Sequence, residues 1–274
     1  FNTLVRLSGF SHGTDVWLGN ARDLIVSGTA SVLETVGCRD DIMLYLIHMG
    51  LDPKMSFKIM EAVRKGKVKK GGFDEGWEEA MMEHDVPDWY IESLAKIGYL
   101  FPKAHAVAYV MMAFRIAWFK VHEPLAFYAT FFTVRAKAFD AEYCCAGLDA
   151  VKRKIREIEN NKDASAVEQD LMTTLEVCHE FYRRGFTFEP MDVYTSDATR
   201  FLVTENGLIP PFTSMPGIGE QAALSIVEER KNGRFLSAEE MIIRCPKASK
   251  AVVELLDQIG ALGSMPKTTQ MSLF

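Results

Sequence analysis

The sequence predicts a mainly α-helical protein with one small β element. Three observations carry this prediction. Long segments with helical patterning dominate the chain, short alternating runs appear around residues 200–209, and a glycine-opened turn near residue 217 leads into a further helix. With 274 residues, the chain is long enough to bury more than one hydrophobic core, so we expect more than one domain. Hydrophobic residues make up 48% and charged residues 25%, which is typical of globular proteins and argues against wholesale disorder.

The first half of the chain has the pattern of successive helices. Polar residues that can cap a helix, or a proline that can begin one, precede each amphipathic run. The predicted helices run from Ser11 or Thr14 to Gly28, from Asp40 or Asp41 to Gly50, and from Pro53 to the basic stretch 64–72.

The segment from Pro102 to about His122 is apolar on nearly every face, which predicts a helix at the centre of a helical domain. Its longest apolar run stops at Arg115, well short of the ~20 residues that cross a bilayer, so no membrane partner is expected. Lys103 and His105 fall in the first helical turn, where free backbone N–H groups favour an anion. The alternative is a lysine that extends from a core helix and a histidine that hydrogen-bonds a backbone carbonyl.

The second half begins with helices and then changes character. Pro124 opens an aromatic-rich helix, and two long charged helices follow in 147–184, separated near Asn160. Two short apolar runs flank Asn206-Gly207, the dipeptide typical of a tight β-hairpin turn. The sequence therefore predicts a small β element between the helical halves.

Net charge is −6, and the excess of acid lies in one half of the chain. Residues 1–139 carry 16 Lys/Arg and 16 Asp/Glu, whereas residues 140–274 carry 15 and 21. Any nucleic-acid contact in the second half must therefore be local and made by backbone amides. The basic stretch that contains Arg64, Lys65 and Lys67 is either solvated surface or a phosphate contact.

A tight turn, Pro216-Gly217-Ile218-Gly219, leads into an amphipathic helix. Glycines leave the backbone uncovered, so that amides of Ile218, Gly219 and the next residues can face a phosphate. A second unit follows, in which the helix 250–258 ends in an Ile-Gly-Ala-Leu-Gly turn. These features predict a tandem helix-hairpin-helix domain that holds a duplex by its backbone, without reading base sequence.

The last five residues form a peptide suited to capture by another protein. Gln270-Met271-Ser272-Leu273-Phe274 ends on two apolar anchors that such a short tail cannot bury against itself. In extended form it can place Leu273 and Phe274 in a partner's pocket, and it resembles the pentapeptide with which bacterial polymerases bind the sliding β clamp. The alternative is a frayed terminus without function.

The five cysteines lack paired CxxC spacing, which argues against a zinc ribbon and a disulfide framework and predicts reduced thiols in the cytoplasm. No secretion signal is present, and the abrupt start at Phe1 suggests a fragment of a longer protein. No metal site is expected in this chain.

Several motifs in one order resemble the C-terminal part of the PolC-type α subunit of bacterial DNA polymerase III. They are SHGTDVW at 11–17, GCRDD at 37–41, FPKAH at 101–105, GIG at 217–219 and QMSLF at 270–274. The resemblance spans essentially the whole chain.

The resemblance implies that four segments of the chain have different functions. Residues 1–140 would be the fingers, which close over the incoming deoxynucleoside triphosphate; residues 141–185 would connect; residues 186–266 would bind the product duplex; and residues 267–274 would bind the clamp. The implied nucleotide-binding residues are Lys103 and His105, then Arg39 and Arg115, with Ser11 and His12 at the base-pair pocket. Arg39 and Arg115 could equally belong to internal ion pairs, and Ser11 could be a helix cap.

Other residues are implied to contact DNA: Gly217, Ile218 and Gly219 in the hairpin, and Arg64, Lys65 and Lys67 on template phosphate. Primed template DNA, other replisome subunits and the clamp are the implied partners. The family's Mg²⁺ ions are held by palm carboxylates, and no such motif occurs here. The chain alone is therefore expected to be inactive. The rival hypothesis is a stand-alone, non-catalytic adaptor that binds DNA and recruits a clamp.

Overall fold

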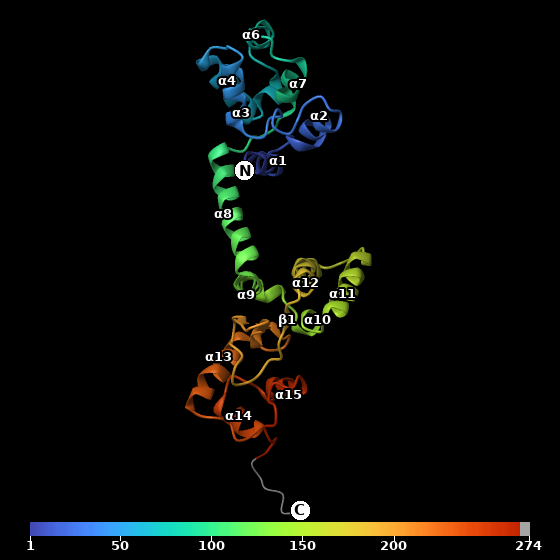
Figure 1. Ribbon diagram of the computed structural model, residues 1–274, viewed down its shortest axis with the longest axis vertical. Coiled ribbons are helices and arrows are strands. Elements are labelled where there is room, and N and C mark those ends of the chain that lie inside the picture. The colour runs from blue at the N-terminus through green and yellow to red at the C-terminus, as the bar shows by residue number, and fades with distance from the viewer. Residues whose placement is uncertain (269–274) are drawn as a thin grey trace, which may run out of the picture. The chain divides into compact units, whose positions relative to one another are not determined.

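The computed structural model describes residues 1–268, which form two compact units that divide after Ala117 (Figure 1). Helices dominate both units, and the described strands form one small sheet. The prediction of a mainly α-helical protein with a small β element is confirmed. The four predicted functional segments do not coincide with the two units and stay predictions.

The first unit is a cluster of helices around a core to which α3, α4 and α7 each contribute buried residues. Ile42 and Leu46 from α3 and Ile59 and Val63 from α4 are fully buried in this core. The helices are α1 (Asn2–His12), α2 (Arg22–Val26), α3 (Arg39–His48), α4 (Pro53–Arg64), α5 (Lys67–Gly71), α6 (Trp77–Glu83), α7 (Asp88–Lys96) and the start of α8 (Lys103–His122).

The helix predicted to run from Ser11 or Thr14 to Gly28 is wrong. Ser11 lies near the end of α1, and its Oγ donates to the Ser8 carbonyl instead of capping a following helix. The segment Trp17–Ala21 is irregular, with Gly19 at a φ of 70°, and only Arg22–Val26 is regular helix. The backbone of Thr14 instead pairs with that of Tyr99 in an isolated β-bridge, which the local sequence pattern does not reveal.

The burial expected for α8 is also wrong. Among the residues of this helix only Ala106 and Val110 are buried, while most of its large apolar side chains are about half exposed. Within residues 1–268, α8 is the helix whose length and apolar composition would fit a membrane span, which by itself is weak evidence for one.

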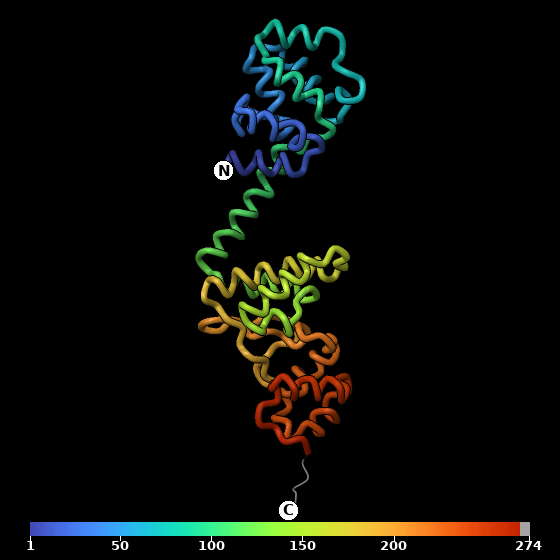
Figure 2. Tube along the Cα trace, turned by 90° about the vertical axis from the view of Figure 1, so that its right-hand side faces the viewer, coloured from blue at the N-terminus to red at the C-terminus, as the bar shows by residue number. Residues whose placement is uncertain are grey.

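The second unit packs helices around an aromatic core. Phe132, Phe139, Phe181 and Phe201 are buried there, and their rings contact one another or the ring of Phe188. The two charged helices α11 and α12 lie side by side (Figure 2). The helices are α9 (Pro124–Val134), α10 (Ala141–Cys144), α11 (Leu148–Asn160), α12 (Ala166–Arg183), α13 (Glu220–Glu229), α14 (Ala238–Arg244) and α15 (Lys250–Gln258).

The predicted hairpin around Asn206 is confirmed. Strand β2 (Leu202–Val203) pairs antiparallel with β3 (Gly207–Ile209), with Val203 opposite Leu208. Strand β1 (Thr187–Phe188) adds in parallel on the other side of β3. Gly207 is required here because a Cβ at this position would lie 1.9 Å from the Thr187 carbonyl oxygen. The sheet joins α12 to the hairpin turn that precedes α13.

Candidate nucleic-acid interface

The start of α8 is organised around the carboxylate of Asp41. This side chain is only 8% exposed and accepts hydrogen bonds from the backbone amides of Gly37 (3.2 Å) and Cys38 (2.9 Å). Arg6 from α1 approaches Asp41 Oδ2 to 3.4 Å, and Lys103 Nζ lies 3.3 Å from Oδ1. Asp41 therefore fixes the position of Lys103 while keeping three other partners of its own.

Lys103 is fixed in position by Asp40 and Asp41, yet its side chain remains accessible to solvent. Its side chain is 42% exposed, and its backbone N–H donates to Asp40 Oδ2 at 2.9 Å. A cavity of about 260 Å³ opens beside it, lined also by Arg6, Cys38 and Asp41. Burial, reinforced by the carboxylates of Asp41 and Asp40, raises the pKa of the Cys38 thiol to about 12. The thiol is therefore protonated at neutral pH, and the charge this cavity offers to an anion comes from Arg6 and Lys103.

Arg39 lies on the other side of the acidic pair. Its Nε is 3.8 Å from Asp40 Oδ2 and is buried without a hydrogen-bond acceptor among residues 1–268, and its backbone N–H donates to the Phe101 carbonyl. The structure therefore gives Arg39 the ion pair that the sequence left as an alternative. Its part in nucleotide binding stays a prediction.

An aromatic stack adjoins this charged cluster. The His12 ring stacks on Phe101, with centroids 4.9 Å apart, and lies 5.8 Å from Tyr109. His105 meets the edge of the same Phe101 ring. His12 Nδ1 lies 2.8 Å from the Ser8 carbonyl, so the end of α1 fixes this ring in place. The sequence motifs around His12 and around His105, 93 positions apart, therefore meet at Phe101.

Arg115 lies away from this cluster. Twelve helical residues separate it from Lys103, which corresponds to about 18 Å along α8. Within residues 1–268 its guanidinium makes one described hydrogen bond, to the Met112 sulfur at 3.9 Å, and no ion pair. The structure thus brings Lys103, His105, Arg39, Ser11 and His12 together and leaves Arg115 outside.

The basic stretch after α4 is partly neutralised. Arg64 Nη2 donates to Glu61 Oε2 at 2.9 Å, and Lys65 Nζ lies 2.7 Å from the same oxygen. Hydrogen bonds from Arg64 and Lys65 lower the pKa of Glu61 to about 2, so this carboxylate is charged at neutral pH. Lys67 begins the short helix α5. Their contact with template phosphate stays a prediction.

Glu61→Gln tests that prediction in the full-length protein. If Arg64 and Lys65 contact template phosphate, removal of the competing carboxylate strengthens primer-template binding about threefold at low salt and steepens the salt dependence. Fluorescence anisotropy at several salt concentrations measures both. Glu92→Gln is the matched control, because Glu92 is exposed on α7 and has no described partner. Equal affinities for Glu61→Gln and the unsubstituted protein would place these two cations off the DNA.

The hairpin turn before α13 exposes unpaired backbone amides. Gly217 has a φ of 94°, the left-handed conformation that favours glycine, and lies against Leu255 of α15. The Ile218 N–H donates to the Met215 carbonyl at 3.1 Å, so the expectation that it faces a phosphate is wrong. Within residues 1–268, the amides of Gly219, Glu220, Gln221 and Ala222 have no backbone acceptor, since the helical pattern starts with Ala223 donating to Gly219. The amides left available for a ligand therefore begin at Gly219.

Gly219 differs from Gly217 in its backbone conformation and in the space around it. Its φ of −74° and ψ of 155° suit any residue, and an added Cβ would meet no atom within 4 Å. The fold therefore does not require glycine at 219. The missing side chain leaves the amides open to an approaching ligand.

The two hairpins are not equivalent. The second pairs α14 with α15, and Ser249 caps α15 by accepting from the Val252 amide. Ile218, Val252 and Leu256 share one core with Ala261 and Leu262, so the second hairpin packs against the first. Within residues 1–268, the first hairpin lacks a side-chain cap at its helix start, whereas Ser249 pairs the Val252 amide at the second.

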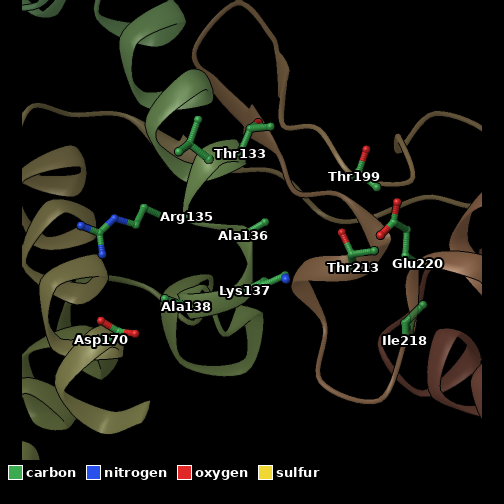
Figure 3. A pocket seen from close by; sticks show the side chains of 11 residues that line it. Thr133, Arg135, Ala136, Lys137, Ala138, Asp170, Thr199, Thr213, Ile218 and Glu220 are labelled. Atoms are coloured by element: carbon green, nitrogen blue, oxygen red, sulfur yellow. The ribbon is translucent and has the colours of Figure 1, made fainter. Parts of the chain in front are cut away.

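A hollow of about 610 Å³ adjoins the first hairpin (Figure 3). Ile218 and Glu220 line one side, and the 3₁₀ turn Ala136–Ala138 with its Lys137 lines the other. In Figure 3 the Lys137 side chain points toward Thr213 and Glu220, while Arg135 points toward α12. The hollow is open and carries charges of both signs, so it does not define a small-molecule site.

The tail Gln270, Met271, Ser272, Leu273 and Phe274 falls outside the described residues. Within residues 1–268, no group of three His, Cys, Asp or Glu side chains could hold a metal ion. These residues therefore do not fit the Mg²⁺ pair of a polymerase.

Sequence reasoning missed Asp41, Phe101 and Tyr109 as parts of the site. The sequence indicates the Asp40-Asp41 pair only as a helix start, because the contacts of Asp41 with Arg6 and Lys103 join residues far apart in sequence. The ring of Phe101 stands two residues before Lys103, a proximity that could have suggested it.

Comparisons with known proteins give the site its context. Residues 1–85 match the family model described as "Bacterial DNA polymerase III alpha subunit finger domain", and residues 185–271 match "Helix-hairpin-helix motif". A "DNA polymerase III PolC-type" of Bacillus cereus is 54% identical over 275 residues, covering 100% of this chain. The chain is similar to PolC-type DNA polymerase III along its whole length. PolC-type relatives from Streptococcus thermophilus and Streptococcus sanguinis are 53% and 54% identical over 279 residues.

The chain spans only 19% of the length of each of these PolC-type relatives. The matched finger-domain segment contains Asp41, Arg39 and His12, and the matched helix-hairpin-helix segment contains the free amides at Gly219. The cation Lys103 lies outside both segments but within the whole-chain similarity.

Proposed function

We propose that this chain is the C-terminal part of a bacterial replicative DNA polymerase of the PolC type. It would supply incoming-nucleotide binding, product-duplex binding and attachment to the sliding β clamp. The observation that carries the proposal is the 54% identity that extends over the entire chain to a PolC-type polymerase. The geometry of the two sites supports it independently.

The start of α8 would bind the incoming deoxynucleoside triphosphate. Lys103 presents an accessible cation beside the N-terminus of a 20-residue helix, where charge on a leaving pyrophosphate is favoured. The stacked rings of His12 and Phe101 offer a flat apolar surface of the kind on which nucleobases stack. Phosphate and base recognition would thus lie side by side.

The first hairpin would bind the product duplex through its backbone. Amides from Gly219 onward, which have no backbone acceptor within residues 1–268, would bind one phosphate without a cationic side chain, and an acidic half of the chain could hold DNA in this way. Such contacts position the duplex and carry no base specificity.

Catalysis of nucleotide addition would require residues outside this chain. When bound, Mg²⁺ in this enzyme class stabilises the attacking and leaving oxygens of the in-line displacement at the α-phosphate. Described residues here provide no ligand set for it, so their role is to bind and orient the nucleotide and the duplex. Other replisome subunits are proposed partners, and the cytoplasm is the proposed location.

The tail would bind the β clamp. The segment before it is anchored, because the carbonyls of Pro266 and Lys267 accept hydrogen bonds from the Ala238 and Glu239 amides at the start of α14. Deleting Leu273 and Phe274 from the full-length protein is expected to abolish clamp binding, since both apolar anchors are lost. Isothermal titration calorimetry with purified clamp measures this.

Synthesis on short primed templates without clamp serves as the control for the tail deletion and should stay unchanged. Clamp affinity retained within threefold would show that the tail is not the tether.

The proposal as a whole is tested by the mass of the native polypeptide. Peptide-mapped mass spectrometry from source cells should find a species about five times as long as this chain, since 19% of the relatives corresponds to 274 residues. It should extend primers with deoxynucleoside triphosphates. A native species of about 30.8 kDa would favour the adaptor hypothesis instead.

A further inference from the structure

The first unit carries an apolar surface formed by α1 and α8. Its large hydrophobic side chains are between 43% and 57% exposed, although each would be expected in a core. We call it the α1–α8 apolar surface; it comprises Phe1, Leu4, Leu7, Tyr109, Met111, Met112, Phe114 and Ile116. Isolated exposed apolar residues are ordinary, but a contiguous set of this size marks a contact surface.

Contacts between the two helices make this surface continuous. Val5 of α1 is buried in one cluster with Ala106 and Val110 of α8, so the helices pack directly against each other. At the other end of the contact the rings of Phe1 and Phe114 lie 5.8 Å apart. On α8 the exposed residues recur on several sides, and a helix that is apolar all round is normally buried.

A lipid bilayer does not fit this surface. The first turns of α8 are fixed in the protein by buried Ala106 and Val110, which leaves the twelve residues 111–122. At 1.5 Å per residue they extend about 18 Å, against a hydrocarbon thickness of about 30 Å. Arg115 and Lys120 also lie within this length.

We propose that, in the full-length protein, the α1–α8 apolar surface is covered by the part of the polypeptide that precedes residue 1. This inference rests on the proposed function, in which the chain is the C-terminal part of a longer polymerase. The relatives are about five times as long as the 274 residues here, which cover 19% of them. Because the Phe1 ring contacts Phe114, any residue that precedes Phe1 starts at this surface.

The charges on α8 indicate which side chains the covering segment must present. The helix contains no Asp or Glu, and within residues 1–268 Arg115 has no described ion pair, its one hydrogen bond being to the Met112 sulfur. A guanidinium that becomes buried needs a counter-charge. The segment that covers this surface therefore presents apolar side chains and a carboxylate opposite Arg115.

Site-specific cross-linking in the full-length polymerase tests the inference. A photoreactive residue is introduced as Met112→benzoylphenylalanine and, separately, as Ile116→benzoylphenylalanine. After irradiation and digestion, mass spectrometry is expected to find both positions joined to peptides upstream of residue 1. The matched control is Met82→benzoylphenylalanine on α6, which is 57% exposed and away from this surface.

Cross-links confined to residues 1–274, cross-links between two polypeptides, or a yield no higher than at Met82 would each overturn the inference. The second of these outcomes would assign the surface to a second copy of the chain.

A measurement on the unsubstituted enzyme avoids any effect of substitution on folding. Hydrogen peroxide should oxidise Met111 and Met112 at least tenfold more slowly than in the urea-unfolded enzyme, at all protein concentrations. Rates equal to those of the unfolded enzyme, or protection lost on dilution, would overturn the inference. Neither readout uses nucleotide or DNA, so this inference can fail while nucleotide binding at Lys103 holds, and the reverse.

Discussion

Replacing Lys103 by alanine in the full-length protein is expected to lower kcat/KM for the incoming deoxynucleotide about 100-fold. Loss of one charge-assisted contact to a developing phosphate charge typically costs about 3 kcal/mol, which corresponds to this factor. Steady-state primer extension over a range of nucleotide concentrations measures it and separates the effect on KM from that on kcat.

The contacts of Asp41 make this experiment interpretable. Without Lys103, the Asp41 carboxylate still has Arg6 and two backbone amides, so the fold should be retained. Thermal unfolding within a few degrees of the unsubstituted protein verifies this. Lys96→Ala is the matched control, because Lys96 is an exposed lysine in the last turn of α7 with no described partner. A kcat/KM for Lys103→Ala within twofold of that control would refute the nucleotide assignment.

Gly219→Val is expected to weaken duplex binding at least tenfold, and equally for duplexes of different sequence. The branched side chain would stand in front of the unpaired amides at the start of α13, while the space around Gly219 is empty in the protein itself. Fluorescence anisotropy with several duplexes of equal length measures the loss. A uniform loss is expected because, in the proposed binding mode, these amides would contact the phosphate backbone alone.

The control for Gly219→Val is Ala166→Val, another small-to-valine change at an exposed first turn of a helix in the same unit. That helix, α12, is capped by Ser165 and Glu168, which pair the Glu168 and Ser165 amides with each other's side chains, so valine there should leave DNA binding unchanged. A sequence-dependent loss for Gly219→Val, or an equal loss for both variants, would contradict the assignment.

Local patterns predicted those elements whose signals are contained in a few neighbouring residues. Pro53, Asn206-Gly207 and Pro124 correctly marked a helix start, a hairpin and a second helix start. The helix predicted after Ser11 is wrong because the backbone of Thr14 forms a β-bridge with Tyr99, a partner distant in sequence. The exposure of α8 was missed because apolar periodicity indicates that a surface will be covered, without indicating by what.

In the candidate site, too, the residues with a local sequence signal were predicted, whereas those that act through distant contacts were not. The sequence identified Lys103, His105 and Gly219 from helix starts and glycine spacing, and the structure places the first two beside His12 and Arg39. The role of Asp41 and the contact between His12 and Phe101 depend on folding. The Ile218 amide could not be excluded from sequence, since its bond to Met215 depends on the shape of the turn.

If the start of α13 binds phosphate as proposed, the chain loses little stability by leaving this helix start uncapped. Helices α12, α14 and α15 each begin at a serine whose hydroxyl accepts from a first-turn amide, whereas α13 begins at Gly219 without such a bond. A glycine in place of serine at this position costs roughly a few tenths of a kcal/mol. A serine at 219 would make the helix slightly more stable and would compete for the amides with any phosphate. At this one helix start, the stabilising residue and the binding-competent residue are different amino acids.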